Sequence, residues 1–156
     1  MIQIDIPGFR KITIRHIVAD HNGTLACEGT LLPGVAESFR RLAQRVHIHV
    51  VTADTFGMAA AQLKGLPCRL TILPKENQAV KKLEYVQSLG VDETVCIGNG
   101  RNDRLMLKAA VIGIALLQEE GAAAETLAAA DVVCRNIRDA LALFESEKRL
   151  IATLRS

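Results

Sequence analysis

The chain has 156 residues, a hydrophobic fraction of 49% and only 3% aromatic residues. This length suits one domain with a sizeable core, and we expect residues 1–156 to form a single unit. The scarcity of aromatic side chains disfavours nucleic-acid binding by base stacking, and a net charge of +2 is too small for an electrostatic nucleic-acid surface. The sequence shows no apolar run long enough for a membrane span.

Four cysteines are spread through the sequence without any CxxC pair. This spacing indicates neither a zinc site nor a redox motif. Cys96 and Cys134 lie inside apolar runs and are expected to be core residues. Reduced thiols and the lack of a recognisable signal peptide predict a cytoplasmic location.

The N-terminal part is predicted to be a β-hairpin that leads into a buried strand. Apolar runs at 2–6 and 12–19 are separated by a turn that begins at Pro7. The second run stops abruptly at Asp20, and residues 20–33 are short, irregular and rich in turn-forming residues. We expect this segment to form a small flap over the end of the strand.

A helix is predicted to begin near Pro33, because proline is favoured in a first helical turn. A strand at 47–52 follows, in which His47 and His49 alternate with apolar residues. We expect both histidines to be exposed strand residues and not metal ligands, because no carboxylate or cysteine lies nearby in sequence.

The rest of the chain alternates regularly between predicted strands and helices. We first expect a helix ending near Lys64, a strand at 68–73 and a helix from Lys75 to about Leu89. A strand at 94–98, a helix ending near Ala110, a strand at 111–116, a helix at 121–130 and a strand at 131–134 should follow. The last expected element is a helix from about Asn136 with a break at 145–149. Such alternation is typical of a parallel sheet with helices on both faces. The predicted fold is a Rossmann-like three-layer α/β/α sandwich.

Four predicted strand ends carry polar side chains suited to phosphate chemistry. They deliver Asp20, Thr52, Lys75 and Asp103 to what should be one edge of the sheet. A carboxylate can attack phosphorus without a general base, provided that its own charge and the charge of the phosphate are offset. A divalent ion between the two carboxylates, the lysine ammonium and the threonine hydroxyl would supply that compensation.

Four segments together resemble the motifs of the haloacid dehalogenase (HAD) superfamily of phosphohydrolases. The segments are Asp20-His21-Asn22-Gly23-Thr24, Val50-Val51-Thr52-Ala53-Asp54, Pro74-Lys75-Glu76-Asn77 and Gly98-Asn99-Gly100-Arg101-Asn102-Asp103. The last is similar to the motif of P-type ATPases. The whole chain most resembles small soluble proteins that are similar to the phosphorylation domain of those pumps.

The resemblance implies a role for each matching residue. Asp20 would be the nucleophile, and the catalytic set would be Asp20, Asn22, Thr52 and Lys75. Phosphate would be bound by Asp20, Thr52, Ala53 and Lys75. A Mg²⁺ ion would be held by Asp20, Asn22, Asn99 and Asp103.

Two residues depart from the family pattern. Asn22 stands where these phosphatases have a second aspartate that protonates the leaving group and then activates water. An amide can do neither, and general acid–base help is worth about 10²–10⁴-fold in rate. We expect His21 not to substitute, because in an extended segment it should point away from Asn22. Asn99 replaces a common acidic ligand of Mg²⁺, so the predicted metal site carries less negative charge.

The sequence therefore predicts a Mg²⁺-dependent phosphatase that forms an aspartyl-phosphate on Asp20 and turns over slowly. The alternative is a phosphate-binding or phospho-accepting regulatory protein with negligible turnover. The segments between the motifs are too short for a cap domain. We expect a phosphorylated substrate, no nucleic-acid or membrane partner, and an open site that a homo-oligomer could complete. The apolar residues of the last helix are expected to pack on the home domain.

Overall fold

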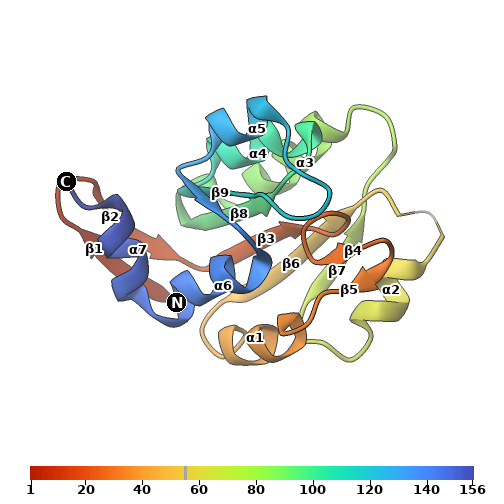
Figure 1. The fold of residues 1–156 in the computed structure, drawn as a ribbon, viewed down its shortest axis with the longest axis horizontal. Coiled ribbons are helices and arrows are strands. Elements are labelled where there is room, and N and C mark those ends of the chain that lie inside the picture. The colour runs from red at the N-terminus through yellow and green to blue at the C-terminus, as the bar shows by residue number, and fades with distance from the viewer. Residues whose placement is uncertain (55) are drawn as a thin grey trace.

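Six parallel strands form the central sheet of the structure (Figure 1), a computed structural model that describes residues 1–54 and 56–156. In spatial order the strands are β10 (Val132–Cys134), β9 (Ile112–Leu116), β8 (Thr94–Gly98), β3 (His16–Asp20), β6 (His47–Thr52) and β7 (Arg69–Ile72). Strand β3 lies in the interior of the sheet between β8 and β6. Its apolar run is buried on both faces, as expected for a central parallel strand.

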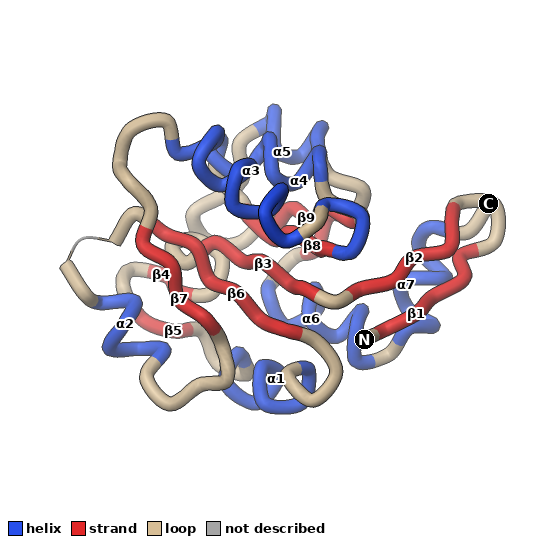
Figure 2. The backbone as a smooth tube through the Cα atoms, turned by 180° about the vertical axis from the view of Figure 1, so that it is seen from behind, coloured by secondary structure: helices blue, strands red, loops and turns tan. Residues whose placement is uncertain are grey.

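Helices cover both faces of this sheet (Figures 1 and 2), so the predicted three-layer α/β/α architecture is confirmed. One face is covered by α3 (Gln78–Leu89), α4 (Arg104–Ala109) and α5 (Ala124–Ala129). The other is covered by α1 (Val35–Leu42), α2 (Met58–Leu63) and α6 (Ile137–Glu145). Short 3₁₀ turns, η1 (Val91–Glu93) and η2 (Arg101–Asp103), precede β8 and α4.

The N-terminal hairpin is a separate two-stranded sheet made of β1 (Ile2–Ile6) and β2 (Arg10–Ile14). Alternate isoleucines of both strands are fully or almost fully buried. They pack in one core with α6 and with α7 (Glu147–Leu154), which lies along the hairpin in both views (Figures 1 and 2). The expected helix break occurs at Ser146, and the apolar residues of this region pack on the home domain as predicted.

A small flap follows β3, as the sequence indicates. It is a two-stranded hairpin of β4 (Ala26–Cys27) and β5 (Thr30–Leu31). Residues 20–34, which connect β3 to α1, contain this hairpin and no separate cap domain. Among residues 1–54 and 56–156, no helix has the length and apolar character needed to cross a bilayer.

The prediction that Lys75 opens a helix was wrong, because α3 begins only at Gln78. Asn77 adopts a left-handed conformation with φ of 54°, so the chain turns immediately before the helix. Residues after Pro74 are therefore loop, and the helix that we expected to start at position 75 is displaced by three residues. This displacement matters for the site described below.

The expectation of exposed histidines was also wrong for His49, which is only 5% exposed. Its Nε2 atom lies 3.0 Å from Nδ1 of His16, and its Nδ1 lies 2.8 Å from the hydroxyl of Tyr85. His47, which is exposed, stacks on His16. Burial, reinforced by the neighbouring His16, lowers the pKa of His49 to about 4.

We predict that this buried histidine makes the fold sensitive to acid. An unfolded histidine titrates near 6.5, so between pH 6.5 and pH 4 the unfolded chain binds a proton that folded His49 does not. The free energy of unfolding should therefore fall as pH decreases through this window, by on the order of 3 kcal/mol from His49. Urea unfolding at several pH values measures this slope. The slope should be much flatter in His49→Gln and less affected in His47→Gln, because the charge of His47 is only a smaller cause of the shift at His49. An equal slope in all three proteins would refute the prediction.

Candidate active site

Strand register brings three of the predicted residues to one edge of the sheet. Asp20 is the last residue of β3 and lies opposite Val51 of β6, so Thr52 at the end of β6 is one residue further along. On the other side of β3, strand β8 ends at Gly98 and delivers the loop that contains Asp103. The edge predicted from the strand ends is therefore present.

A lysine that the sequence analysis missed lies between the two carboxylates. Lys82, in α3, is completely buried, and its Nζ atom is 2.7 Å from Oδ1 of Asp20 and 2.7 Å from Oδ1 of Asp103. Removing an ammonium group from water costs several kcal/mol unless oppositely charged groups replace the water. The two carboxylates do this, and together the three side chains carry one net negative charge.

Asp103 uses both of its carboxylate oxygens within the protein. Oδ1 accepts a hydrogen bond from Lys82, and Oδ2 accepts from the backbone N–H groups of Asn99 and Gly100, each at 2.9 Å. Gly98 allows this approach, because a Cβ there would overlap the carboxyl group of Asp103. Asp103 therefore holds the loop after β8 in shape and fixes the position of Lys82.

Lys82 engages one of the two carboxylate oxygens of Asp20. Lys82 contacts Oδ1, and within residues 1–54 and 56–156 no side chain hydrogen-bonds to Oδ2. The side chain is 10% exposed. Burial and the nearby charge of Asp103 raise the pKa of Asp20 to about 7, against the opposing effect of Lys82. Burial favours the neutral amine of Lys82, but the two carboxylates outweigh it and raise the pKa of that lysine.

Thr52 and Ala53 lie beside this group at the end of β6. Thr52 is buried, and its Oγ1 accepts a hydrogen bond from the backbone N–H of Asp54 at 3.2 Å. The side chain of Asp54 in turn accepts from the N–H groups of Phe56 and Ala59, which fixes the turn into α2. Within residues 1–54 and 56–156 the Thr52 hydroxyl donates no hydrogen bond, so its hydrogen can serve a bound oxyanion.

His21 contacts Asn22, so the expectation that it points away was wrong. Its ring is 1% exposed, with Nδ1 at 3.3 Å from Oδ1 of Asn22 and Nε2 at 3.2 Å from Oε1 of Gln62. The segment is not extended here, because the carbonyl of His21 accepts hydrogen bonds from the N–H groups of Thr24, Leu25 and Ala26 and a turn begins at His21. Asn22 itself is exposed at the mouth of the site.

Asn99 is held firmly while its amide oxygen stays nearly free. Its Nδ2 donates to the carbonyl of Gly121 at 3.0 Å, and its Oδ1 accepts only a long hydrogen bond, 3.4 Å, from the hydroxyl of Thr24. The described residues contain no group of three or more histidine, cysteine or acidic side chains placed to hold a metal. The side chains of Asp20 and Asn99 offer carboxylate and amide oxygens, the ligand type that Mg²⁺ prefers.

Lys75 is not brought to the two carboxylates. Its side chain is exposed, and its Nζ atom lies 6.0 Å from the centroid of the Phe56 ring. Within the described part of the chain Lys75 forms no ion pair, whereas Lys82 forms two. The signal for Lys82 was present in the sequence, because it lies four residues before Val86 on the buried stripe of α3. A lysine on an apolar stripe indicates a buried partner of opposite charge.

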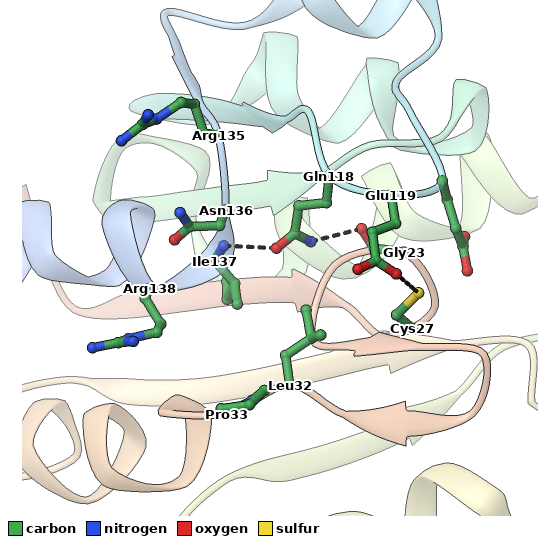
Figure 3. Close-up of a pocket in the computed structure, with 11 residues that line it drawn as sticks. Gly23, Cys27, Leu32, Pro33, Gln118, Glu119, Arg135, Asn136, Ile137 and Arg138 are labelled. Atoms are coloured by element: carbon green, nitrogen blue, oxygen red, sulfur yellow. Dashed lines mark hydrogen bonds between the residues drawn. The ribbon is translucent and has the colours of Figure 1, made fainter.

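A cavity of about 340 Å³ borders the loop after Asp20, between the flap and the segments that follow β9 and β10 (Figure 3). It is lined by Gly23, Cys27, Leu32, Pro33, Gln118, Glu119, Glu120, Arg135, Asn136, Ile137 and Arg138. Gln118 joins its walls, since its amide donates to the carbonyls of Gly23 and Thr24 and accepts from the N–H of Ile137. The cavity therefore opens beside the same loop that carries the nucleophile candidate.

Comparison with known proteins places this geometry in a family. A family model described as haloacid dehalogenase-like hydrolase matches residues 69–143. An uncharacterised protein of Methanocaldococcus jannaschii is 39% identical over 83 residues, which is 51% of this chain and 89% of that protein.

Solved structures share the fold at low sequence identity. The 3-deoxy-D-manno-octulosonate 8-phosphate phosphatase of Moraxella catarrhalis, in complex with magnesium, phosphate and KDO, aligns with a TM-score of 0.71 and 16% identity, over 91% of this chain and 94% of that one. The cobalt-bound enzyme of that name from Haemophilus influenzae aligns with a TM-score of 0.72 and 13% identity, over 92% and 94%. The chain belongs to the haloacid dehalogenase superfamily.

We predict that Lys82 is required for stability and that Lys75 is not. Removal of one partner from a buried ion pair leaves an uncompensated charge and costs about 3–5 kcal/mol. Lys82→Gln should therefore lower the free energy of unfolding by about that amount in metal-free buffer, as measured by urea denaturation. Lys75→Gln, the matched surface control, should change it by less than about 0.5 kcal/mol. Equal stabilities of the two variants would contradict the arrangement described here.

Proposed function

We propose that this protein is a phosphatase that forms an aspartyl-phosphate on Asp20. The single observation that carries the proposal is the buried Lys82, which bridges Asp20 and Asp103 at the carboxyl edge of a HAD-type sheet. A buried cation beside a carboxylate that keeps one accessible oxygen is the arrangement required for attack on an anionic phosphoryl group. The phosphatases among the structural relatives are consistent with this chemistry.

In the first step, Oδ2 of Asp20 forms a bond to phosphorus while the bond from phosphorus to the leaving oxygen breaks. Lys82 offsets the negative charge brought together by nucleophile and phosphate. We assign to Lys82 the charge-stabilising role that the sequence pattern gave to Lys75. Thr52 donates its hydroxyl hydrogen to a phosphoryl oxygen, and we assign the same donor role to the backbone N–H of Ala53.

The site suits Mg²⁺ as the cofactor, which when bound would neutralise charge on the phosphoryl oxygens. Asp20 and Asn99 would hold the ion through side-chain oxygens, and Asn22 would contribute a further oxygen. Asp103 belongs to the same site as a positioning residue, because both of its oxygens are already engaged.

In the second step, water attacks phosphorus, the bond to Asp20 breaks, and inorganic phosphate leaves. This step lacks a base, because the Asn22 amide cannot accept the proton of the attacking water. The aspartyl-phosphate should therefore persist. This same observation favours a second candidate function, a phospho-accepting regulatory protein with negligible turnover.

The physiological substrate is proposed only as a phosphorylated small molecule. Acyl or aryl phosphates suit the site best, because their leaving groups depart without a proton, which Asn22 cannot supply. A cytoplasmic location and completion of the site by a second copy of the chain stay predictions.

We predict that hydrolysis of p-nitrophenyl phosphate or acetyl phosphate requires both Mg²⁺ and Asp20. Activity should fall to background in Asp20→Asn and after chelation of the metal, because the first removes the nucleophile and the second removes charge compensation. Asp92→Asn, which changes an exposed acid at the opposite edge of the sheet, should leave the rate unchanged. A wild-type protein that is silent on both substrates, with no phosphoenzyme, would rule out the phosphatase and phospho-acceptor readings together.

We further predict that dephosphorylation limits turnover. Rapid mixing with acetyl phosphate should give a burst of acid-stable phosphoprotein close to one equivalent, followed by slow steady-state release of phosphate. Asn22→Asp restores a carboxylate and should speed release by up to about 10²–10⁴-fold while the burst shrinks. A wild-type time course without a burst, or an Asn22→Asp rate equal to that of wild type, would contradict this. A burst with no subsequent turnover would identify the phospho-acceptor.

A further inference from the structure

The proposed metal site is short of negative charge. Both carboxylate oxygens of Asp103 accept hydrogen bonds, from Lys82 and from two backbone N–H groups of the loop. Of the two motif aspartates, Asp20 is therefore the one that can bind a cation. Asn22 and Asn99 offer only neutral oxygens. A divalent ion held by a single carboxylate would bind weakly, so a further acid in reach of Asn99 would change the affinity substantially.

Glu120 lies in reach of Asn99. An atom placed at the Cβ position of Gly23 would be 2.6 Å from Oε2 of Glu120, 2.5 Å from Nδ2 of Asn99 and 2.8 Å from Oδ1 of Asn99. The carboxylate and the amide therefore converge over the same point of the loop that follows Asp20. A side chain on residue 23 would fill this space, and glycine leaves it open.

The segment that carries Glu120 is fixed to both halves of the site. Asn99 binds it through two hydrogen bonds, from its Nδ2 to the carbonyl of Gly121 at 3.0 Å and from the N–H of Ala123 to its own carbonyl at 2.9 Å. Gln118 ties the same segment to the carbonyls of Gly23 and Thr24. These hydrogen bonds fix the backbone on both sides of Glu120, so its place beside Asn99 does not depend on its side-chain rotamer alone.

The neighbouring acid is directed elsewhere. Oε2 of Glu119 accepts a hydrogen bond from the Cys27 thiol of the flap at 3.1 Å (Figure 3). Glu120 has no hydrogen bond or ion pair to any side chain within residues 1–54 and 56–156. Two adjacent glutamates on one loop therefore have different surroundings, and only Glu120 converges with Asn99.

We propose that Glu120 is an acidic ligand of the divalent cation, acting with Asp20 and Asn99 and supplying the charge that Asn99 lacks. The inference rests on the proposed function, because it concerns the metal of that site. Glu120 lies in the segment between β9 and α5, outside the four motif segments. In this arrangement the carboxylate of Glu120, from the loop after β9, takes the place of the acidic ligand that Asn99 replaces in the loop after β8.

The test is a titration with Mn²⁺, followed by the loss of the electron paramagnetic resonance signal of the free ion, in the absence of any substrate. Glu120→Gln and Glu120→Ala should weaken binding by about 10–100-fold. Glu119→Gln, the matched control on the same loop, should bind Mn²⁺ within twofold of wild type. Asn99→Asp placed in the Glu120→Gln background should restore most of the affinity, because it returns a carboxylate to the other side of the same point.

The outcomes separate this inference from the proposed function. If wild type binds Mn²⁺, Asp20→Asn does not, and both Glu120 variants bind like wild type, the assignment of Glu120 is overturned while the phosphatase proposal stands. If wild type itself binds no Mn²⁺, the assignment and the proposed metal dependence both fall. Far-UV circular dichroism and thermal unfolding without metal verify that the variants are folded.

Discussion

The contact of Lys82 with two carboxylates is the interaction on which the site depends. It joins three elements that are distant in sequence: the end of β3, the interior of α3 and the loop after β8. A fully buried ammonium must have such partners, so α3 can pack on the sheet only in the register that brings Lys82 to them. The packing of α3 on the sheet and the formation of the site therefore depend on the same contacts.

The same interaction divides the work of the two acidic residues. Asp103 holds the lysine and two backbone amides, and its contribution is therefore to shape and charge balance. Asp20 shares only one oxygen with Lys82 and retains the other for chemistry. Burial and the nearby charge of Asp103 raise the pKa of Asp20 to about 7, against the opposing effect of Lys82. A bound cation would stabilise the ionised carboxylate.

The sequence predicted the sheet edge because local signals are strong there. Buried strands that end at Asp20, Thr52 and Gly98 can be read from apolar runs followed by turn-forming residues, without knowledge of tertiary contacts. The lysine was assigned to position 75 because it directly follows a predicted strand end, whereas the lysine that reaches the two carboxylates is Lys82, inside α3. His49 was misjudged for a related reason, since its burial depends on Tyr85, which is remote in sequence. The burial of Lys82 and of His49 is accompanied by contacts with residues remote in sequence, which a local pattern does not reveal.

The residues that depart from the family pattern affect the two chemical steps unequally. In the proposed reaction, attack on phosphorus uses Asp20, Lys82 and Thr52, and all three side chains are buried and hydrogen-bonded. Hydrolysis needs a base at position 22, where the amide instead contacts His21. That imidazole is enclosed between Asn22 and Gln62, so it orients the amide and has no free nitrogen to activate water. Under the proposed mechanism, this arrangement favours formation of the phosphoenzyme over its breakdown, and the lifetime of the aspartyl-phosphate is the property that the site would control.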